Sequence, residues 1–245
     1  MPFFLVQPED IAGGKVFIRG EDARHLSKVL RCRPGEEITV MDGEKEYTVV
    51  VEKTDGREVV GRITAEFPCR REPPLPVVLY QGVAKGEKMD LVVQKAIEIG
   101  VTTLVPVLTE RVVVRLDAAK GEQRRERWQR IAREAAKQAG RGRIPLVEKL
   151  HTWPEAVARA AAEGYPAVVL WEKAERGLKE FITARPRPAG VSLFIGPEGG
   201  LAEAEVELAR QQGFAVARLG PRILRTETAG TVAAALFLFA WGDIG

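Results

Sequence analysis

The chain has 245 residues, of which 45% are hydrophobic and 29% are charged, and its formal net charge is +3. This composition is that of an ordinary globular protein with one large domain or two smaller ones. No apolar run reaches the roughly 18 residues of a membrane span, and the N-terminal segment does not predict a signal peptide. The chain has two cysteines and two histidines, which lie far apart in sequence, so we expect neither a disulfide framework nor a metal site. We also expect the protein to be cytoplasmic.

The first 66 or so residues predict a small β domain. A helix is expected over Asp22–Leu30 and a turn at Arg33–Glu36, and the Asp42-Gly43 dipeptide is a strong hairpin signal between two strands. Several short strands at this spacing indicate a small β-barrel. The expected strands are Val16–Ile18, Ile38–Met41, Tyr47–Val51 and Val59–Ala65.

A proline-rich segment, Phe67–Pro76, follows this β domain and has four prolines among ten residues. Such a segment is stiff and extended, so we place a domain boundary there, between residues 1–70 and 71–245.

Beyond the boundary, strand and helix patterns alternate and the strands are continuously apolar, which predicts an α/β domain with a mostly parallel sheet. The expected strands are Val77–Gln81, Leu104–Leu108, Ala167–Trp171, Val191–Ile195 and Ala215–Leu219. The expected helices are Lys88–Ile99, Ala118–Ala139, Trp153–Ala162, Glu203–Gln212 and Thr228–Trp241.

Positive charge is concentrated between Arg111 and Arg143, where eleven Lys or Arg residues face four Asp or Glu residues. A basic stretch on a nearly neutral chain favours a polyanionic partner such as nucleic acid. The alternative is a solvated helix face with internal ion pairs.

Two loops leave strand ends with unusual composition, and ligands bind beyond the carboxyl ends of strands in α/β sheets. The first loop, Gly196–Gly200, reads GPEGG, and the second, Leu219–Ala229, reads LGPRILRTETA. Either is explicable as a plain helix entry, with Thr226 or Thr228 as the N-cap of the last helix. That reading gives no structural reason for Glu198 in the first loop or for the two arginines in the second.

Competing motifs fail. The segment Gly82–Lys88 lacks the spacing of a phosphate-binding loop, no GxGxxG follows the first strand of the α/β domain, and no Ser or Cys occupies a nucleophile elbow. Phosphoryl transfer, dinucleotide-dependent hydride transfer and acyl transfer are therefore disfavoured.

The two loops together resemble the bacterial RsmE family, knotted SPOUT-type methyltransferases that methylate uridine N3 in 16S ribosomal RNA. The helix after GPEGG departs from the family pattern, since it opens with Leu201-Ala202 where an aromatic residue and a Ser-like cap are expected. Further similar segments are Arg24–Leu26, Val29–Arg31, Lys95–Val101, Glu110-Arg111, Trp128, Glu134-Ala135 and Gln138.

The resemblance implies an N-terminal PUA-like RNA-binding barrel, a C-terminal domain with a trefoil knot, a homodimer, and S-adenosylmethionine as the cofactor. Ile223, Leu224 and Leu170 are expected to cover the adenine, and the loop glycines to let the backbone approach the cofactor. The expected cofactor-binding residues are Leu170, Ile195, Gly196, Pro197, Gly199, Leu219, Gly220, Ile223, Leu224, Arg225, Thr228 and Ala229.

Uridine N3 carries a proton and is a poor nucleophile until that proton leaves, so the site needs a base or a cation that stabilises the developing oxyanion. Glu198 and Glu227 are the candidate bases, and Arg225 is the candidate oxyanion partner. Glu227 has an alternative role, which is to order its loop by pairing with Arg222 or Arg225.

Contacts to ribosomal RNA or the small subunit are expected from basic residues in both domains. His25 has an alternative role as a barrel residue, and Trp128 is expected in the core or a dimer interface. Two other functions stay open: a related knotted enzyme acting on a ribose 2′-hydroxyl or a guanine, and a non-catalytic RNA-binding ribosome-assembly factor. The expected RNA contacts are Arg24, His25, Arg31, Arg111, Arg115, Arg141 and Arg143.

Overall fold

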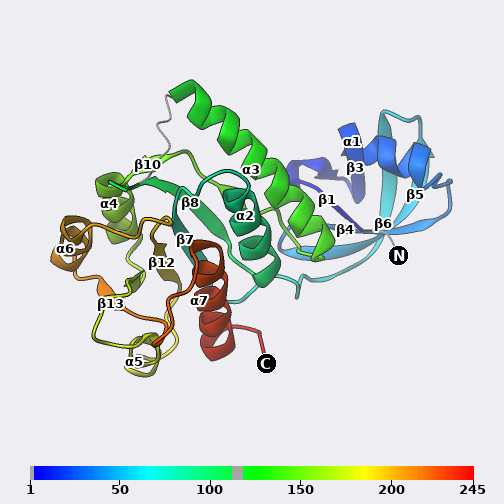
Figure 1. The fold of residues 1–245 in the computed structure, drawn as a ribbon. Helices are drawn as coiled ribbons and strands as arrows, with labels where there is room; N and C mark the ends of the chain where they lie inside the picture. The colour runs from blue at the N-terminus through cyan, green and yellow to red at the C-terminus, as the bar shows by residue number, and fades with distance from the viewer. Residues whose placement is uncertain (1–2, 112–117) are drawn as a thin grey trace. The chain divides into compact units, whose positions relative to one another are not determined.

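The computed structural model describes residues 3–111 and 118–245 (Figure 1). The chain forms two compact units. One comprises the residues up to Glu72 together with Ala136–Ile144, and the other comprises Pro73–Ala135 and Pro145–Gly245. The return of Ala136–Ile144 to the N-terminal unit is a feature that no sequence pattern indicates.

The N-terminal unit contains a six-stranded sheet with the order β1-β4-β5-β6-β3-β2. β1 pairs with β4 in parallel and the other pairs are antiparallel. The predicted hairpin is confirmed: β4 and β5 are joined through Asp42-Gly43, where Asp42 Oδ1 accepts hydrogen bonds from the amides of Glu44 and Lys45. The strands are β1 Phe3–Leu5, β2 Ile11–Ala12, β3 Lys15–Arg19, β4 Glu37–Met41, β5 Lys45–Thr54 and β6 Glu58–Pro68.

Alternating side chains of this sheet form the core of the unit. On β5, Tyr47, Val49 and Val51 are buried while their neighbours are more exposed, which is the period of a strand with one covered face. The predicted helix is confirmed, with two residues added at its start: α1, Gly20–Arg24, continues into the π-helical segment His25–Val29. A 3-10 turn, Pro8–Asp10, precedes β2.

The C-terminal unit contains a seven-stranded sheet with the order β10-β8-β7-β12-β11-β13, and β9 also pairs with β8. Every described pair in this sheet is parallel, so the expectation of a mostly parallel sheet is confirmed. The strands are β7 Val77–Gly82, β8 Thr103–Leu108, β9 Leu146–Val147, β10 His151–Thr152, β11 Ala167–Leu170, β12 Val191–Ile195 and β13 Ala215–Ala217.

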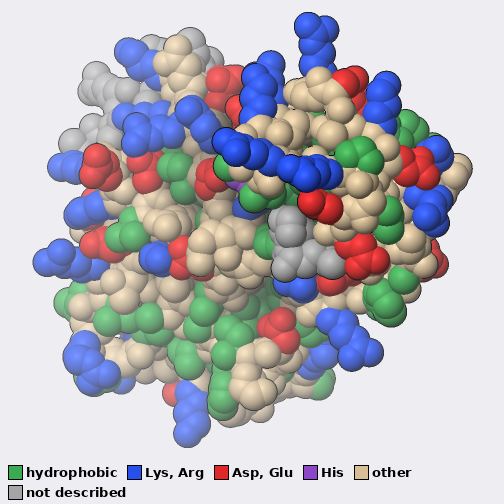
Figure 2. Space-filling model, turned by 90° about the vertical axis from the view of Figure 1, so that its right-hand side faces the viewer, with side chains coloured by type: hydrophobic (Ala, Val, Ile, Leu, Met, Phe, Trp, Pro, Cys, Tyr) green, Lys and Arg blue, Asp and Glu red, His purple; other side chains and the backbone are tan. Residues whose placement is uncertain are grey.

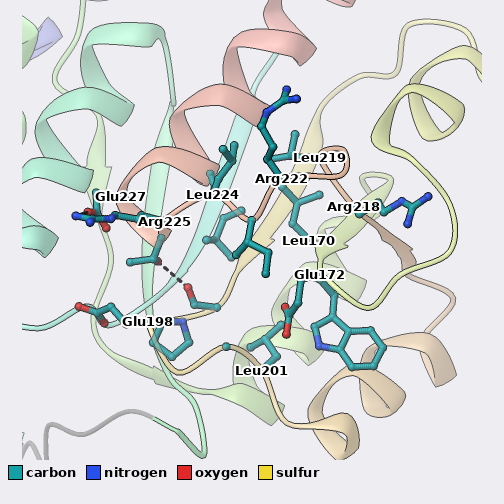
Figure 3. Close-up of a pocket in the computed structure, with 18 of the residues that line it drawn as sticks. Leu170, Glu172, Glu198, Leu201, Arg218, Leu219, Arg222, Leu224, Arg225 and Glu227 are labelled. Carbon is teal, nitrogen blue, oxygen red and sulfur yellow. Dashed lines mark hydrogen bonds and ion pairs between the residues drawn. The ribbon is translucent and has the colours of Figure 1, made fainter.

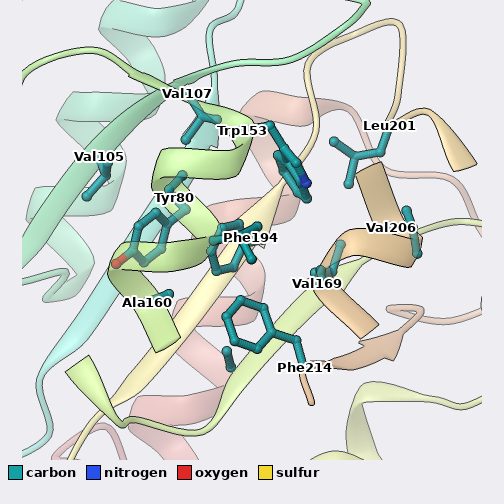
Figure 4. Close-up of a cluster of buried hydrophobic side chains, with 14 of the residues drawn as sticks. Tyr80, Val105, Val107, Trp153, Ala160, Val169, Phe194, Leu201, Val206 and Phe214 are labelled. Carbon is teal, nitrogen blue, oxygen red and sulfur yellow. The ribbon is translucent and has the colours of Figure 1, made fainter. Parts of the chain in front are cut away.

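Helices cover both faces of this sheet. α2 and α7 pack together on one face, and α4 contacts α6 and β8 on the other. On the α4 side, the ring of Tyr80 stacks on that of Phe194 with 4.2 Å between the ring centroids, and Trp153 meets Phe194 edge-on (Figure 4). The helices are α2 Lys88–Ile99, α3 Ala118–Gln138, α4 Trp153–Glu163, α5 Leu178–Thr183, α6 Glu203–Gln211 and α7 Thr226–Trp241.

Most helix bounds agree with the sequence prediction. α2 has the predicted bounds and ends at Gly100, whose φ of 119° is a left-handed conformation that favours glycine. α7 begins at Thr226 rather than at Thr228, and Arg225 is its N-cap residue. The alternative in which Thr226 or Thr228 is the N-cap of this helix is therefore wrong. Among the described residues, no helix combines the length and the apolar character needed to cross a membrane.

Candidate functional site

A pocket of about 520 Å³ lies beyond the carboxyl ends of β11 and β12 and beside the segment that joins β13 to α7 (Figure 3). Both loops singled out from the sequence contribute to its wall, although they lie on separate parts of the chain. Of the residues expected to bind a cofactor, all except Thr228 line this pocket, and so do the candidate catalytic residues Glu198, Arg225 and Glu227.

The pocket has an apolar middle and charged sides. Leu170, Leu219 and Leu224 lie in the middle of the view in Figure 3. Glu198 lies on the same side of these leucines as Arg225 and Glu227, whereas Arg218 lies toward the other side. An apolar surface beside convergent charged groups is the usual composition of a small-molecule site.

The GPEGG loop is held by hydrogen bonds from several elements. The Thr226 hydroxyl donates to the carbonyl of Gly196 at 2.7 Å, and Arg111 Nη1 donates to the carbonyl of Gly199 at 3.1 Å. Backbone packing also fixes the loop, because a Cβ atom on Gly82 of β7 would lie 2.6 Å from the nitrogen of Pro197. The loop is therefore fixed against β7, α7 and the segment after β8.

Glu198 has a structural role that the sequence analysis did not find. Its Oε1 accepts a hydrogen bond from the Lys85 amide at 3.1 Å and pairs with Lys88 Nζ at 3.1 Å. Burial alone would raise the pKa of Glu198, but hydrogen bonds from the amides of Glu198 and Lys85, together with the Lys88 ammonium, hold this pKa below its usual range. The statement that this carboxylate lacks a structural reason is wrong, because it joins the GPEGG loop to the segment before α2.

The second loop presents side chains with few partners. Arg225 is 83% exposed, and its Nη1 lies 4.0 Å from Glu227 Oε1, the outer limit of an ion pair. The Glu227 side chain is only 13% exposed, and its Oε2 is buried without a hydrogen-bond partner among the described residues. A buried carboxylate oxygen without a partner is costly, and such groups are typical of functional sites.

The pocket wall also contains charged residues that the sequence analysis missed. Lys88, the first residue of α2, belongs to the segment that was tested only as a phosphate-binding motif. Glu172 and Arg218 lie just beyond the ends of β11 and β13. Glu172 directly follows the expected strand Ala167–Trp171, which was the available signal, whereas Arg218 lies inside the expected strand Ala215–Leu219. No group of three or more His, Cys, Asp or Glu side chains suited to a metal ion occurs in the part of the chain that the structure describes.

The expected RNA contacts differ in their exposure. Arg24, His25 and Arg31 are exposed, and Arg31 has a φ of 53°, a conformation rare outside glycine. Arg141 is 4% exposed and its Nη2 lies 2.7 Å from Glu72 Oε2, so its prediction as an RNA contact is wrong. Arg143 is 56% exposed and donates a hydrogen bond to the Gly43 carbonyl.

Arg111 and Arg115 are two further expected RNA contacts. Arg111 is exposed, but it also braces the GPEGG loop through Gly199. Arg115 lies outside the described residues. Trp128 is 3% exposed and is therefore a core side chain of the C-terminal unit.

Much of the charge in the basic stretch is neutralised within the protein. Arg127 pairs with Asp90, Lys137 pairs with Asp22, and Arg125 pairs with Glu122. Figure 2 likewise shows acidic side chains among the basic ones over the face in view. The alternative of internal ion pairs therefore accounts for part of the stretch, and the count of basic residues overstates the positive charge of the surface.

Known RNA methyltransferases are similar to this chain over most of its length. Residues 71–238 match the model of an RNA methyltransferase domain, and residues 18–64 match that of an RNA methyltransferase PUA domain. The ribosomal RNA small subunit methyltransferase E of Bacillus subtilis is 33% identical over 217 residues, which cover 86% of this chain and 85% of the relative. That of Aquifex aeolicus is 32% identical, over 90% of this chain and 93% of the relative.

Two solved methyltransferase structures are also similar to this chain over nearly its whole length. The structure of ribosomal RNA small subunit methyltransferase E from Neisseria gonorrhoeae bound to S-adenosyl methionine is 34% identical, covers 100% of both chains, and has a TM-score of 0.86. A putative methyltransferase from Legionella pneumophila, in complex with SAM, is 33% identical over 98% of both chains, with a TM-score of 0.83. The expectation of an α/β methyltransferase domain with a mostly parallel sheet and an N-terminal PUA-like part is confirmed. This chain belongs to the RNA methyltransferase family that includes the ribosomal RNA small subunit methyltransferases E.

Proposed function

We propose that this protein transfers the methyl group of S-adenosylmethionine to N3 of a uridine in 16S ribosomal RNA. The observation that carries the proposal is the shared pocket: the GPEGG loop and the loop before α7 form one cavity with an apolar middle and with Glu198, Arg225 and Glu227 on one side. Together with the family of the chain, this arrangement accounts for both a cofactor and a nucleophile that must be deprotonated.

The pocket suits the proposed cofactor in size and chemistry. Its volume of about 520 Å³ lies within the range of small-molecule sites. Leu170, Leu219 and Leu224 offer the apolar surface that an adenine ring requires. S-adenosylmethionine, when bound, supplies a methyl group already activated by a positive sulfur. Carboxylates in the wall, such as Glu172 and Glu227, suit a ligand that carries positive charge.

The structure favours Glu227 over Glu198 as the base. Glu198 is occupied by the Lys85 amide and Lys88, and its lowered pKa makes it a weaker proton acceptor. Glu227 lies in the pocket wall, and its Oε2 has no hydrogen-bond partner among the described residues, so this carboxylate keeps the capacity to accept the N3 proton of the uridine. The exposed guanidinium of Arg225 is free to stabilise the negative charge that develops on O2 or O4.

For RNA binding, we assign the phosphate contacts first to Arg24, His25 and Arg31 in the N-terminal unit, with Arg143 as an additional contact. Arg111, which contacts the GPEGG loop, is assigned to RNA near the pocket, and Arg115 remains a contact expected from the sequence alone. These contacts make the affinity for RNA depend on salt, and removing a phosphate contact lowers that dependence.

We further propose that the protein is cytoplasmic and forms a homodimer. We also propose that the boundary between its two domains lies after residue 70.

Two experiments test the proposal. Calorimetry measures binding of S-adenosylmethionine to the protein, and mass spectrometry analyses the nucleosides of small-subunit RNA after incubation with the protein and S-adenosylmethionine. The RNA should come from cells that lack this gene, so that the target nucleotide is unmodified. We expect cofactor binding and the appearance of 3-methyluridine. A 2′-O-methylated nucleoside or a methylguanine would instead identify a related specificity. Absence of cofactor binding would contradict methyl transfer and favour the assembly factor.

A further inference from the structure

A buried glutamine of β7 is connected by hydrogen bonds to both loops of the pocket. Gln81 lies near the end of β7 and is fully buried. Its Nε2 donates hydrogen bonds to the Gly82 carbonyl at 3.0 Å and to the Thr226 hydroxyl oxygen at 2.8 Å. The amide group has only two N–H donors, so both are used.

The direction of this hydrogen-bond chain is fixed by its donors. Because the Thr226 oxygen accepts from Gln81, the hydroxyl proton is free to point elsewhere, and it is donated to the Gly196 carbonyl at 2.7 Å. The chain thus runs from β7 through the first residue of α7 to the first residue of the GPEGG loop. Gln81 does not line the pocket, whereas Gly196 and Thr226 do.

This link has a stability cost that an apolar side chain would avoid. Gln81 Oε1 is buried without a hydrogen-bond partner among the described residues. It faces Gly230 of α7, where an added Cβ would lie 3.4 Å away, and the same space is bordered by Leu79 and Ile195. A buried amide with an unpaired oxygen is penalised, and an apolar residue of similar shape is often as stable or more stable. The unpaired Oε1 therefore offsets part of the stability that the two hydrogen bonds from Nε2 contribute.

Resting on the proposed function, we infer that Gln81 and Thr226 are positioning residues for methyl transfer. Thr226 lies between Arg225 and Glu227, so fixing its side chain fixes the first turn of α7 relative to the GPEGG loop. The hydrogen-bond chain holds the Arg225 and Glu227 side chains in one arrangement relative to the backbone of the GPEGG loop. Small displacements between such groups lower the rate steeply, without any loss of contact to the ligand.

The test uses two substitutions that remove hydrogen bonds but keep volume, Gln81→Met and Thr226→Val, and one matched control that keeps the hydroxyl, Thr226→Ser. The measurements are the melting temperature, the dissociation constant for S-adenosylmethionine, and the single-turnover methylation rate at saturating cofactor and RNA. We expect Gln81→Met and Thr226→Val to lose about tenfold or more in rate, with melting temperatures near that of the wild type. Thr226→Ser should stay within about threefold of the wild-type rate.

Three results would overturn the inference. Rates within about threefold of wild type for both Gln81→Met and Thr226→Val would show that the link does not position the site. Equal losses for Thr226→Ser and Thr226→Val would show that the hydroxyl is not the cause. Unfolding of both apolar variants, or a fall in rate that only follows melting temperature, would assign the link to stability. Failure of the wild type to bind the cofactor would instead contradict the proposed function.

Discussion

The two loops that form the pocket differ in how firmly they are held. The GPEGG loop is fixed by Arg111, by Thr226 and, through Glu198, by Lys85 and Lys88. The loop before α7 instead leaves Ile223 84% exposed and Arg225 83% exposed.

This difference separates the scaffold of the site from the groups available for chemistry. A side chain whose polar atoms are already paired must break those contacts before it can act on a substrate, whereas an unpaired side chain is free to do so. The carboxylate that seemed most conspicuous in the sequence, Glu198, belongs to the scaffold. Substitutions in the loop before α7 should therefore lower activity or cofactor binding, whereas substitutions in the GPEGG loop should lower stability.

Arg225→Met should abolish most activity without affecting the fold. The side chain is 83% exposed, and within the described part of the chain its one ion pair is at 4.0 Å, so the melting temperature should not change. Loss of a group that stabilises an oxyanion costs about 100-fold or more in rate, measured in single turnover at saturating cofactor. Arg222→Met, in an exposed arginine of the same loop, is the matched control and should change the rate by only a few fold. Equal losses for both arginines would mean that general charge matters and Arg225 has no specific role.

Ile223→Ala should weaken cofactor binding more than it affects turnover. The side chain is 84% exposed in the free protein and is expected to be covered by the adenine. Removing part of that apolar contact should raise the dissociation constant for S-adenosylmethionine about fivefold, measured by calorimetry. The conservative variant Ile223→Leu should bind almost normally. An unchanged dissociation constant in Ile223→Ala would remove this residue from the cofactor site.

Glu198→Gln should cost stability, because Glu198 braces the GPEGG loop. Losing the charge weakens the bonds from the Lys85 amide and Lys88, and the free energy of unfolding should fall by about 1 kcal/mol in denaturant titration. The matched variant Glu227→Gln should leave stability unchanged or higher, since Glu227 Oε2 has no partner among the described residues. A larger loss in Glu227→Gln would reverse the assignment of the two loops.

The brace should also depend on pH. The folded-state pKa of Glu198 lies below its ordinary value of 4.5, so its contribution to stability is complete above that value. The contribution is lost as the pH falls from there through the lower pKa of the folded protein. The difference in melting temperature between wild type and Glu198→Gln should therefore shrink below pH 4.5. A difference that is constant across this range would show that the Glu198 charge does not hold the loop.

Much of the fold is predictable because it depends on local patterns. The continuous apolar strands and the glycine after α2 indicate the parallel sheet and one helix end, and Asp42-Gly43 indicates the hairpin. The short helix α5 and the two-residue strands were missed, since six residues or fewer carry little periodic signal.

The site was predictable in its location but not in its internal contacts. Glycine-rich loops after strands mark the edge of the sheet where ligands bind. Glu198 bonds to Lys85, Arg141 to Glu72, and Gln81 to Thr226, and these partners lie 113, 69 and 145 residues away in the sequence. Only the folded chain shows such contacts. This is why one predicted RNA contact is a buried ion pair and one candidate base is a brace.

The most direct test of the central claim is the pH dependence of single-turnover methylation by Glu198→Gln and Glu227→Gln. If Glu227 is the base, Glu227→Gln should lose about 100-fold or more in rate at every pH, because its amide group cannot accept the N3 proton. Glu198→Gln should stay within about tenfold of the wild-type rate at each pH. A large loss confined to Glu198→Gln, or wild-type profiles in both variants, would contradict the division of the pocket into a braced loop and a catalytic loop.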